Sequence, residues 1–350
     1  MKISIVILNW NGKKHLENYL PHVIAFSDPA ITSIVVADNG STDDSVEFIK
    51  EEYPQISLIE LDQNYGFAGG YNKALEKVDS DIFCLLNSDV RVTKGWLDPV
   101  VNLFKTDPAI AAIQPKILSD RDHSHFEHAG AAGGFVDKYG YPFCRGRIMN
   151  AIEPDKGQYD KEIDIFWASG ACLFIRADLF RKNNGFDADY FAHMEEIDLC
   201  WRLKNQGYRV VFTPESQIFH WGGATLEYNN PHKLYLNFRN SLWTLYKNYT
   251  GKHLGWTMFN RMITDTFAII KYFVCFDFKN TKAIINAHLS FHRSKPELKE
   301  KRRLLLELVN TTNHKEILNY SIVWQFFFYS RKKFSDFPHF RNQVDEGNQF

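Results

Sequence analysis

Three acidic residues, Glu195, Glu196 and Asp198, lie within four positions of one another in the segment HMEEIDLCWRL (residues 193–203). Acidic side chains are common in the first turn of a helix, because they interact favourably with the helix dipole. Carboxylates this close together also repel one another, and in a crevice that excludes water one of them can have a raised pKa and act as a base. The segment therefore predicts either a helix start or a general base.

A polar triplet ends an apolar run in LLNSDV, residues 85–90. Asn87, Ser88 and Asp89 are residue types that form turns. They are also oxygen donors of the kind that bind a hard divalent cation at the end of a strand. His220 leaves another apolar run, in IFHWGGAT, and is either structural or part of a metal site with Asp89, since imidazole binds Mn²⁺ readily and Mg²⁺ less so.

Two further segments contain residues suited to a nucleotide. In VVADNGSTDDS (residues 35–45), Asp38 can accept hydrogen bonds from a base or ribose, or it can belong to a turn that precedes a helix. In NYGFAGGYNKAL (residues 64–75), Gly66 and Gly69 either allow the backbone to approach a ligand closely or form a tight strand-to-helix loop. Neither segment is a GxGxxG fingerprint or a Walker phosphate loop.

Apolar strands and helices alternate over the first hundred residues. Predicted strands lie at residues 3–8, 33–38, 56–61 and 82–87. Predicted helices lie at residues 12–26, with Pro21 as a candidate break, and at residues 41–53 and 69–78. This order is typical of a parallel sheet with helices on both faces, whose ligands bind beyond the carboxyl ends of the strands. Four polar residues follow the predicted strands and are expected to share one crevice: Asn9, Asp38, Asn64 and Asp89.

Composition excludes several classes of protein. The 350 residues carry 41 Lys and Arg against 42 Asp and Glu, a net charge of −1, so no basic field would attract nucleic acid. The five Cys residues form no CxxC pair, which favours reduced thiols and a cytoplasmic protein. No apolar run reaches the roughly 18 residues that cross a membrane.

Taken in this order along the chain, the segments resemble those of family 2 glycosyltransferases with the GT-A fold. The resemblance rests on SIVILNWNG, VVADNGSTDDS, NYGFAGGYNKAL, LLNSDV, WASGACLFIR, GFDADYFAHMEEIDLCWRL and FHWGG. It is nearest to bacterial rhamnosyltransferase-like and galactofuranosyltransferase-like enzymes of surface polysaccharide assembly. It implies an α/β catalytic domain with a mostly parallel central sheet over residues 1–245. Beyond it, the aromatic and basic pattern of the sequence predicts a helical region at residues 246–338. The polar residues 339–350 are expected to form a flexible tail.

The resemblance also implies an inverting displacement, in which an acceptor hydroxyl attacks a sugar carried on a nucleotide diphosphate. The NSD triplet stands where the family carries its DxD motif, so Asp89 is expected to bind Mg²⁺ or Mn²⁺ together with His220. Asn87 replaces the first Asp of that motif and weakens the negative charge of the site.

The same resemblance suggests the remaining roles. Glu196 matches the second acid of the family's Glu-Asp pair and is the expected base, with Glu195 and Asp198 as alternatives. The strand-exit residues are expected to contact the nucleotide sugar: Asn9, Asp38, Asn64, Gly66, Gly69, Asn87 and Ser88. Three further residues are expected to line the junction of donor and acceptor: Trp167, Ser169 and Gly170.

The expected donor is a dTDP- or UDP-sugar, and the expected acceptor is a glycan or a saccharide on a polyprenyl diphosphate. Residues 256–334 combine Phe, Trp and Tyr with basic clusters. This favours either helical packing and oligomer contact or a peripheral anchor on the anionic inner face of the cell membrane. Two other functions stay open: a nucleotidyltransferase for sugar phosphates, and a sugar-nucleotide-binding protein with a degenerate site. LNWNGKKH is a poor version of the basic Gly-rich loop that the first would need, and Asn87 alone supports the second.

Overall fold

The first four strands form the parallel half of the central sheet. In this computed structural model, which describes residues 1–222 and 230–337, β1 (Ile3–Asn9) lies between β2 (Thr32–Asp38) and β4 (Ile82–Asn87). β3 (Ser57–Glu60) forms the edge beyond β2, and all three pairings are parallel. Asn9 lies opposite Asp38 and Leu8 lies opposite Asn87, so the polar ends of three strands meet at one edge of the sheet. The predicted alternation of strands and helices is confirmed.

The second half of the sheet is mixed. β12 (Cys172–Arg176) runs antiparallel between β4 and β6 (Ile110–Ser119), and β13 (Arg209–His220) runs parallel to β6. Two short strands pair antiparallel with β13: β5 (Val90–Val92) and β11 (Ile163–Asp164). The described residues therefore form a nine-stranded sheet, ordered β11-β13-β6-β12-β4-β1-β2-β3 with β5 beside β13. Because His220 lies opposite Val90, this pairing brings the histidine next to the NSD triplet.

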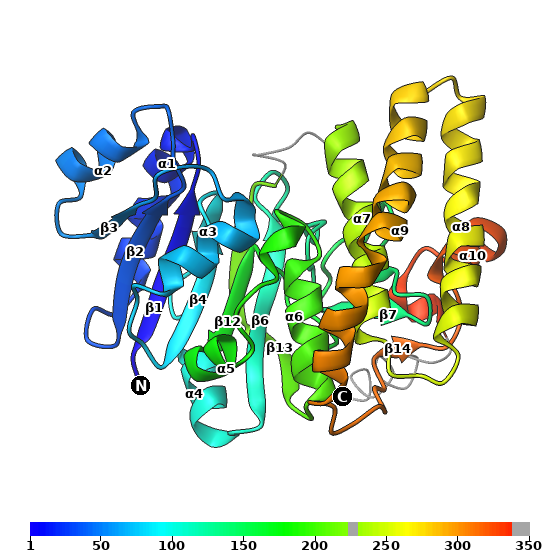
Figure 1. Ribbon diagram of the computed structural model, residues 1–350. Helices are drawn as coiled ribbons and strands as arrows, with labels where there is room; N and C mark the ends of the chain where they lie inside the picture. The colour runs from blue at the N-terminus through cyan, green and yellow to red at the C-terminus, as the bar shows by residue number, and fades with distance from the viewer. Residues whose placement is uncertain (223–229, 338–350) are drawn as a thin grey trace.

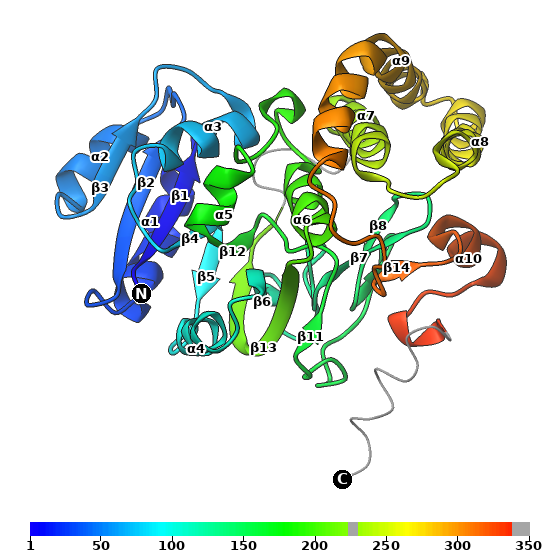
Figure 2. The same ribbon diagram turned by 60° about the horizontal axis from the view of Figure 1, so that its bottom comes forward.

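Helices cover both faces of the sheet (Figure 1 and Figure 2). One face packs against α1 (Lys13–Phe26), α2 (Ser45–Glu52) and α4 (Asp98–Thr106). The other packs against α3 (Gly66–Leu75), α5 (Ala177–Lys182) and α6 (Glu195–Asn205). Successive residues of β1 serve the two cores, with Ile5 and Ile7 on the first face and Val6 on the second. This alternation follows from the two-residue period of a strand.

Two helix boundaries differ from the prediction. α1 continues through Pro21, because residues on both sides of the proline are buried against the sheet. α2 begins at Ser45 instead of near Ser41. The Ser41 hydroxyl accepts a hydrogen bond from the backbone N–H of Asn11 over 2.9 Å, so it joins the loops after β1 and β2.

A second, smaller sheet ties the middle of the chain to its C-terminal region. Its strands, in order, are β10 (Ala151–Ile152), β9 (Arg147–Ile148), β8 (Pro142–Cys144), β7 (Gly134–Asp137) and β14 (Ile317–Leu318). β14 pairs in parallel with β7, so a strand from late in the chain completes this sheet.

Long helices make up most of the C-terminal region: α7 (Pro231–Asn248), α8 (Leu254–Val274), α9 (Phe278–Leu306) and α10 (Ile322–Tyr329). α7 packs along α9, and α8 and α9 form an antiparallel hairpin (Figure 1). The expected boundary after residue 245 falls inside α7, and Phe291, Leu298 and Ile322 join the same core as α6. None of the described helices combines the length and the apolar character needed to cross a membrane. The expected tail at residues 339–350 lies outside the described residues.

Candidate active site

The side chains of Asn9 and Asp38 meet where β1 and β2 end. Asn9 Nδ2 donates a hydrogen bond to Asp38 Oδ1 over 3.0 Å, and the backbone N–H of Ser41 donates to Asp38 Oδ2 over 2.9 Å. Asn9 Oδ1 is buried and accepts no hydrogen bond from any described residue. A Cβ on Gly12 would stand 2.4 Å from this oxygen and 3.6 Å from Ser88 Oγ, so Asn9 and Ser88 border the same small space. A buried acceptor without a donor costs free energy, which favours a ligand that supplies one.

Asn39 was not predicted to belong to the site, yet it organises the loop before α3. Its Nδ2 donates to Asn64 Oδ1 over 3.1 Å and to the Gly66 carbonyl over 2.9 Å. Gly66 has a φ of +72°, and a Cβ there would stand 2.4 Å from the Phe191 carbonyl, so only glycine fits. Gly69 lies inside α3. The predicted residues Asn64 and Gly66 thus shape the wall of the crevice through contacts within the protein.

His220 lies between two carboxylates. Its Nε2 is 3.1 Å from Asp89 Oδ1, its Nδ1 is 3.3 Å from Glu127 Oε2, and all three side chains are buried. The backbone N–H of Gly222 donates to Asp89 Oδ2 over 3.2 Å, and Asn87 Nδ2 lies 3.4 Å from His220 Nε2. The structure therefore brings together Asp89 and His220, which are far apart in the sequence. It adds Glu127, which had no sequence signal because it stands in an irregular loop.

Electrostatics favours an imidazolium between these carboxylates. Burial lowers the pKa of His220, but the charges of Asp89 and Glu127 raise it more and leave it well above its ordinary value. Burial raises the pKa of Asp89, and the charge of His220 brings it below its ordinary value. Burial also raises the pKa of Glu127, and the charge of His220 again brings it below its ordinary value. At neutral pH the three groups therefore carry one positive and two negative charges.

The donor types around Asp89 fit a divalent cation in part. Carboxylate and imidazole are both ligands for Mn²⁺, but Asp89 and His220 are paired with each other here. Across residues 1–222 and 230–337, no group of three His, Cys, Asp or Glu side chains is arranged to hold a metal ion. A cation at Asp89 would therefore take its other ligands from phosphate oxygens or water, and His220 would have to lose a proton to bind it.

The loop before α6 has an unusual backbone. Phe191, His193 and Met194 have φ values of +63°, +71° and +74°, a region that residues with a side chain rarely occupy. Asn240 in α7 donates from Nδ2 to three carbonyl oxygens of this segment, over 2.7 to 3.0 Å. Strained backbone that is held in place by its neighbours is typical of functional sites. Here it sets the position at which α6 begins.

Glu195 and Glu196, at the start of α6, have different surroundings. Glu195 is 3% exposed. Its burial, and to a lesser extent the charge of the adjacent Glu196, raise its pKa well above the ordinary value. Burial raises the pKa of Glu196 to about 7, and backbone hydrogen bonds, one of them from Gly170, partly oppose this rise. The Oε2 atoms of both residues are buried without a hydrogen-bond partner in the described part of the chain. Burial and repulsion thus favour the protonated form of Glu195, and Glu196 changes charge near neutral pH, which suits a general base.

Asp198 belongs to an ion-pair network. Its Oδ2 accepts a hydrogen bond from Arg202 Nε over 3.0 Å. Its Oδ1 lies 3.0 Å from Lys247 Nζ and accepts a hydrogen bond from Asn248 Nδ2 over 2.7 Å. Burial raises the pKa of Asp198, but the charges of Lys247 and Arg202 bring it below its ordinary value. With both oxygens bound, Asp198 positions α6 against α7 and is poorly suited to accept a proton.

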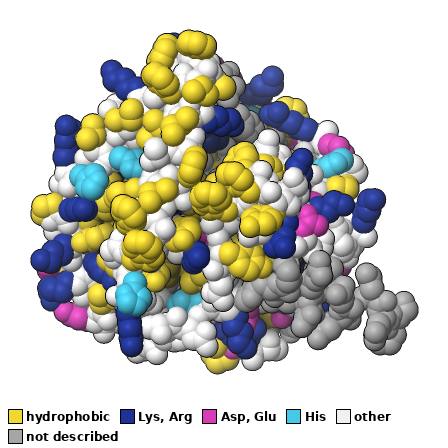
Figure 3. Space-filling model, turned by 90° about the vertical axis from the view of Figure 1, so that its right-hand side faces the viewer, with side chains coloured by type: hydrophobic (Ala, Val, Ile, Leu, Met, Phe, Trp, Pro, Cys, Tyr) yellow, Lys and Arg dark blue, Asp and Glu magenta, His cyan; other side chains and the backbone are white. Residues whose placement is uncertain are grey.

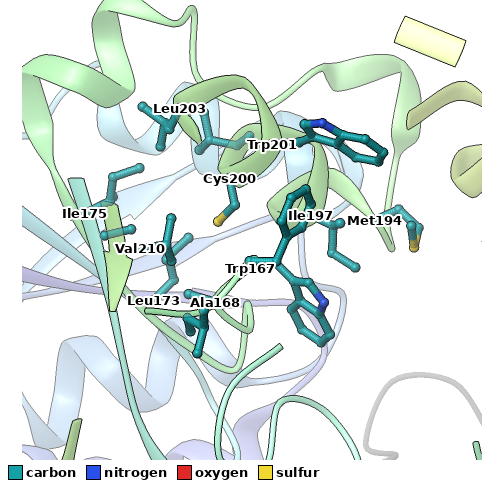
Figure 4. Packing of buried hydrophobic residues seen from close by; sticks show 14 of the residues in the cluster. Trp167, Ala168, Leu173, Ile175, Met194, Ile197, Cys200, Trp201, Leu203 and Val210 are labelled. Carbon is teal, nitrogen blue, oxygen red and sulfur yellow. The ribbon is translucent and has the colours of Figure 1, made fainter. Parts of the chain in front are cut away.

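Trp167 supports α6 from within the core. It is 4% exposed, and its indole Nε1 donates to the Phe135 carbonyl over 2.9 Å. It belongs to the same hydrophobic cluster as Met194 and Ile197 at the start of α6 (Figure 4). The structure therefore places Trp167 behind the acidic residues instead of on the wall of the crevice.

The turn at residues 169–171 joins the acidic residues to the end of β4. Ser169 is buried, and its hydroxyl donates to a backbone carbonyl in the loop after Glu127 over 2.6 Å. The backbone of Gly170 reaches Glu196. The carbonyl oxygen of Ala171 accepts a hydrogen bond from the backbone N–H of Asn87 over 3.0 Å. Through this turn the start of α6, with the expected base, is linked to the NSD triplet at the end of β4.

Comparison with known proteins identifies the family. A family model described as Glycosyl transferase family 2 matches residues 4–183, which are 180 of the 350 residues and include Asn9, Asp38 and Asp89. The chain belongs to glycosyl transferase family 2. In this glycosyltransferase the acidic cluster and His220 lie beyond the matched segment, so their assignment depends on the geometry above.

Two relatives are rhamnosyltransferases by name. The N-acetylglucosaminyl-diphospho-decaprenol L-rhamnosyltransferase of Mycobacterium tuberculosis is 26% identical over 234 residues, which cover 62% of this chain and 75% of the relative. Rhamnosyltransferase WbbL of Escherichia coli K12 is 25% identical over 230 residues, which cover 63% of this chain and 83% of the relative. These similarities confirm the rhamnosyltransferase-like subgroup that the motifs indicated.

A solved structure supports the predicted fold. The crystal structure of GalNAc-T7 with UDP, GalNAc and Mn²⁺ matches with a TM-score of 0.56 at 15% identity, over 71% of this chain and 48% of that one. The predicted GT-A type of fold is thereby confirmed.

Proposed function

We propose that this glycosyltransferase transfers a hexosyl or deoxyhexosyl residue from a dTDP- or UDP-sugar, with inversion at the anomeric carbon. The acceptor is a hydroxyl group of a saccharide carried on a polyprenyl diphosphate, at the inner face of the cell membrane. The name of the M. tuberculosis relative specifies rhamnosyl transfer to such a lipid-linked acceptor. The observation that carries the proposal is Glu196, a carboxyl group with a pKa of about 7 beside the crevice.

In this reaction the Glu196 carboxylate takes the proton of the acceptor hydroxyl group. The acceptor oxygen forms a bond to the anomeric carbon, and the bond from that carbon to the diphosphate breaks, so a nucleoside diphosphate leaves. Attack from the face opposite the leaving group inverts the configuration. Burial and the charge of Glu196 raise the pKa of Glu195, which disfavours a second negative charge next to the base.

The ends of β1 and β2 offer hydrogen-bond acceptors to a nucleotide base. Asn9 Oδ1 is a buried acceptor that lacks a donor among the described residues, and Asp38 is a carboxylate next to it. An N–H group of the nucleotide base would supply the donor that Asn9 Oδ1 lacks.

The departing diphosphate needs positive charge, which a divalent cation held at Asp89 would supply when bound. The solved structure of similar fold contains Mn²⁺. The His220 imidazolium is a positive group of the protein itself at the same place, and Asn87 contributes no charge where the family has an acid. We therefore expect Mg²⁺ or Mn²⁺ to bind mainly together with the donor diphosphate.

Transfer can be tested with purified protein, dTDP- and UDP-sugars, and N-acetylglucosaminyl diphosphate on a short prenyl chain. We expect equal amounts of a glycosylated lipid and a nucleoside diphosphate by mass spectrometry, and an inverted linkage by NMR. Glu196→Gln serves as the matched control. Release of pyrophosphate or a nucleoside monophosphate would instead indicate nucleotidyl transfer. Donor binding without transfer to any acceptor would indicate a degenerate binding protein.

A further inference from the structure

The outward side of α8 is apolar. Six residues on it are between 42% and 66% exposed and recur every three or four positions: Trp256, Phe259, Ile263, Phe267, Ile270 and Val274. A helix at the surface of a globular protein normally turns such a stripe towards the core and exposes charged residues. α8 does the reverse, and Figure 3 shows apolar side chains gathered over this side of the molecule.

Buried polar contacts fix this orientation of α8. Arg261 and Asp265 lie on its inward side, where they are 2% and 1% exposed and pair over 3.1 Å. Arg261 Nη2 donates to Ser241 Oγ over 2.6 Å, and the Tyr141 hydroxyl donates to Asp265 Oδ1 over 2.5 Å. Turning the helix to bury its aromatic residues would break these contacts and leave charges without partners, which is strongly unfavourable. The apolar stripe therefore faces outwards as a consequence of the fold.

The stripe continues into the α8–α9 turn and into α10. Three residues at the turn are 57%, 80% and 57% exposed: Phe273, Phe276 and Phe278. The rings of Phe267 in α8 and Trp324 in α10 lie 5.4 Å apart. α10 adds three exposed aromatic residues: Phe327, Phe328 and Tyr329. We call the stripe, the turn residues and these aromatic residues of α10 the α8–α10 face, and a surface of this kind marks a site of contact.

The α8–α10 face is surrounded by positive charge. Residues 252–295 contain seven Lys or Arg and two Asp, and Arg261 and Asp265 pair with each other inside the protein, which leaves six cations and one anion. Three exposed cations stand near the α8–α9 turn: Lys271, Lys279 and Lys282. A basic run follows α10 at residues 331–333. Because the whole chain has a net charge of −1, this excess of cations is local.

The chemistry of this face matches a lipid surface. Aromatic side chains suit the boundary between headgroups and acyl chains, and Lys and Arg attract anionic headgroups. A second copy of the chain fits less well, since a two-fold interface brings identical patches together and would oppose cations to cations. We propose that the α8–α10 face docks on the surface of a bilayer that contains anionic lipids.

Docking in this way would place the crevice close to the bilayer. The α8–α9 turn and the start of α7 lie at the same end of the molecule (Figure 1). Between α7 and α9 is a hollow of about 450 Å³, lined by His232 from α7 and by Lys279 and Lys282 from α9. The next residue, Lys233, lies near His193 in the loop before α6. The burial of His193 and the charge of Lys233 lower the pKa of His193 to about 4. The lysines of this hollow suit the diphosphate of a lipid-linked acceptor, a role that rests on the proposed function.

Co-sedimentation with vesicles tests the docking surface in the intact chain. We expect the protein to sediment with vesicles of phosphatidylcholine and phosphatidylglycerol at low salt, less at high salt, and less with phosphatidylcholine alone. The combined change Phe273→Ser, Phe276→Ser and Phe278→Ser is expected to lower partitioning on the order of 100-fold, because three aromatic rings leave the interface. The matched control replaces exposed leucines at and just beyond the C-terminal end of α9 and is expected to bind normally: Leu304→Ser, Leu306→Ser and Leu308→Ser.

A second set of variants tests the charges. The neutral variants Lys271→Gln, Lys279→Gln and Lys282→Gln, combined, are expected to lower binding to anionic vesicles on the order of 100-fold, roughly fivefold for each lysine. Three exposed lysines of the sheet domain provide the matched control, which is expected to bind normally: Lys77→Gln, Lys94→Gln and Lys105→Gln.

Several outcomes would overturn the docking surface. The proposal is wrong if the intact protein stays in the supernatant with anionic vesicles at low salt. It is also wrong if the Phe variant sediments to the same extent as the unchanged chain. A dimer that the Phe changes dissociate, without vesicle binding, would assign the face to a second copy. Measuring sugar transfer to a water-soluble acceptor distinguishes failure of the docking surface from failure of the proposed function. If vesicle binding fails while this transfer persists, only the docking surface is wrong; if vesicles bind without any transfer, only the proposed function is wrong.

Discussion

Replacing Glu196 by Gln is expected to lower kcat by about 100-fold or more, because the amide keeps the size of the side chain but cannot accept a proton. The affinity for the donor is expected to change little, since Glu196 acts on the acceptor hydroxyl in the proposed reaction. Isothermal titration with the nucleotide sugar measures the second quantity separately from turnover.

The pH dependence of kcat/KM gives a sharper test, because it reports the pKa of the free enzyme. Burial raises the pKa of Glu196 to about 7. At about pH 6 roughly a tenth of this group is deprotonated, and at about pH 8 roughly nine tenths, so activity is expected to rise about tenfold between them. The sign follows from the role, since only the deprotonated carboxylate can act as the base. An ordinary Glu, with a pKa of about 4.3, would give almost no change over this range.

Glu195→Gln is the matched control, because the raised pKa of Glu195 favours its protonated form, which an amide resembles. This variant is expected to keep both substantial activity and the rise near pH 7. Near-normal turnover in Glu196→Gln would refute the assignment. Loss of the rise in Glu195→Gln, with the rise kept in Glu196→Gln, would transfer the role of base to Glu195.

Two further predictions concern the charged groups around the crevice. Asp89→Ala is expected to abolish the gain in donor affinity that Mn²⁺ gives in calorimetry, and His220→Ala is expected to weaken this gain. EDTA is expected to inhibit the unchanged chain. Full activity of Asp89→Ala in EDTA would show that protein charges alone stabilise the diphosphate. Asp198→Asn is expected to lower the free energy of unfolding in urea by about 3–5 kcal/mol, because the buried Arg202 loses its carboxylate partner, while Lys247 keeps only Asp187. An Asp198→Asn variant with unchanged stability but no turnover would return Asp198 to the candidates for the base.

The order of residues was sufficient to predict the parallel half of the sheet and its functional edge. β1, β2 and β4 are buried on both faces, so each is a continuous apolar run that a polar residue terminates. Asn9, Asp38 and Asp89 could therefore be assigned to one edge of the sheet from the strand order alone. The ordered motifs predicted the family, which the family match confirms.

The local sequence could not distinguish the three acids of α6, because all three occupy the first turn of the same helix. Their roles depend on neighbours from other parts of the chain. Lys247, in α7, neutralises Asp198, whereas Glu196 receives only backbone hydrogen bonds near a turn at Gly170. Glu127 had no recognisable motif, and only the pairing of β5 with β13 shows how His220 comes to the NSD triplet.

The apolar and basic character of the chain around α8 was visible in the sequence, but two interpretations remained, packing inside the protein or contact with a membrane. An amphipathic period shows that a helix has two sides and does not show which side is covered. The tertiary structure decided this, since Tyr141 and Ser241 supply the partners that bury Arg261 and Asp265. The physical reason is that a buried ion pair needs partners that only the folded chain brings together, while an apolar side chain can remain at the surface.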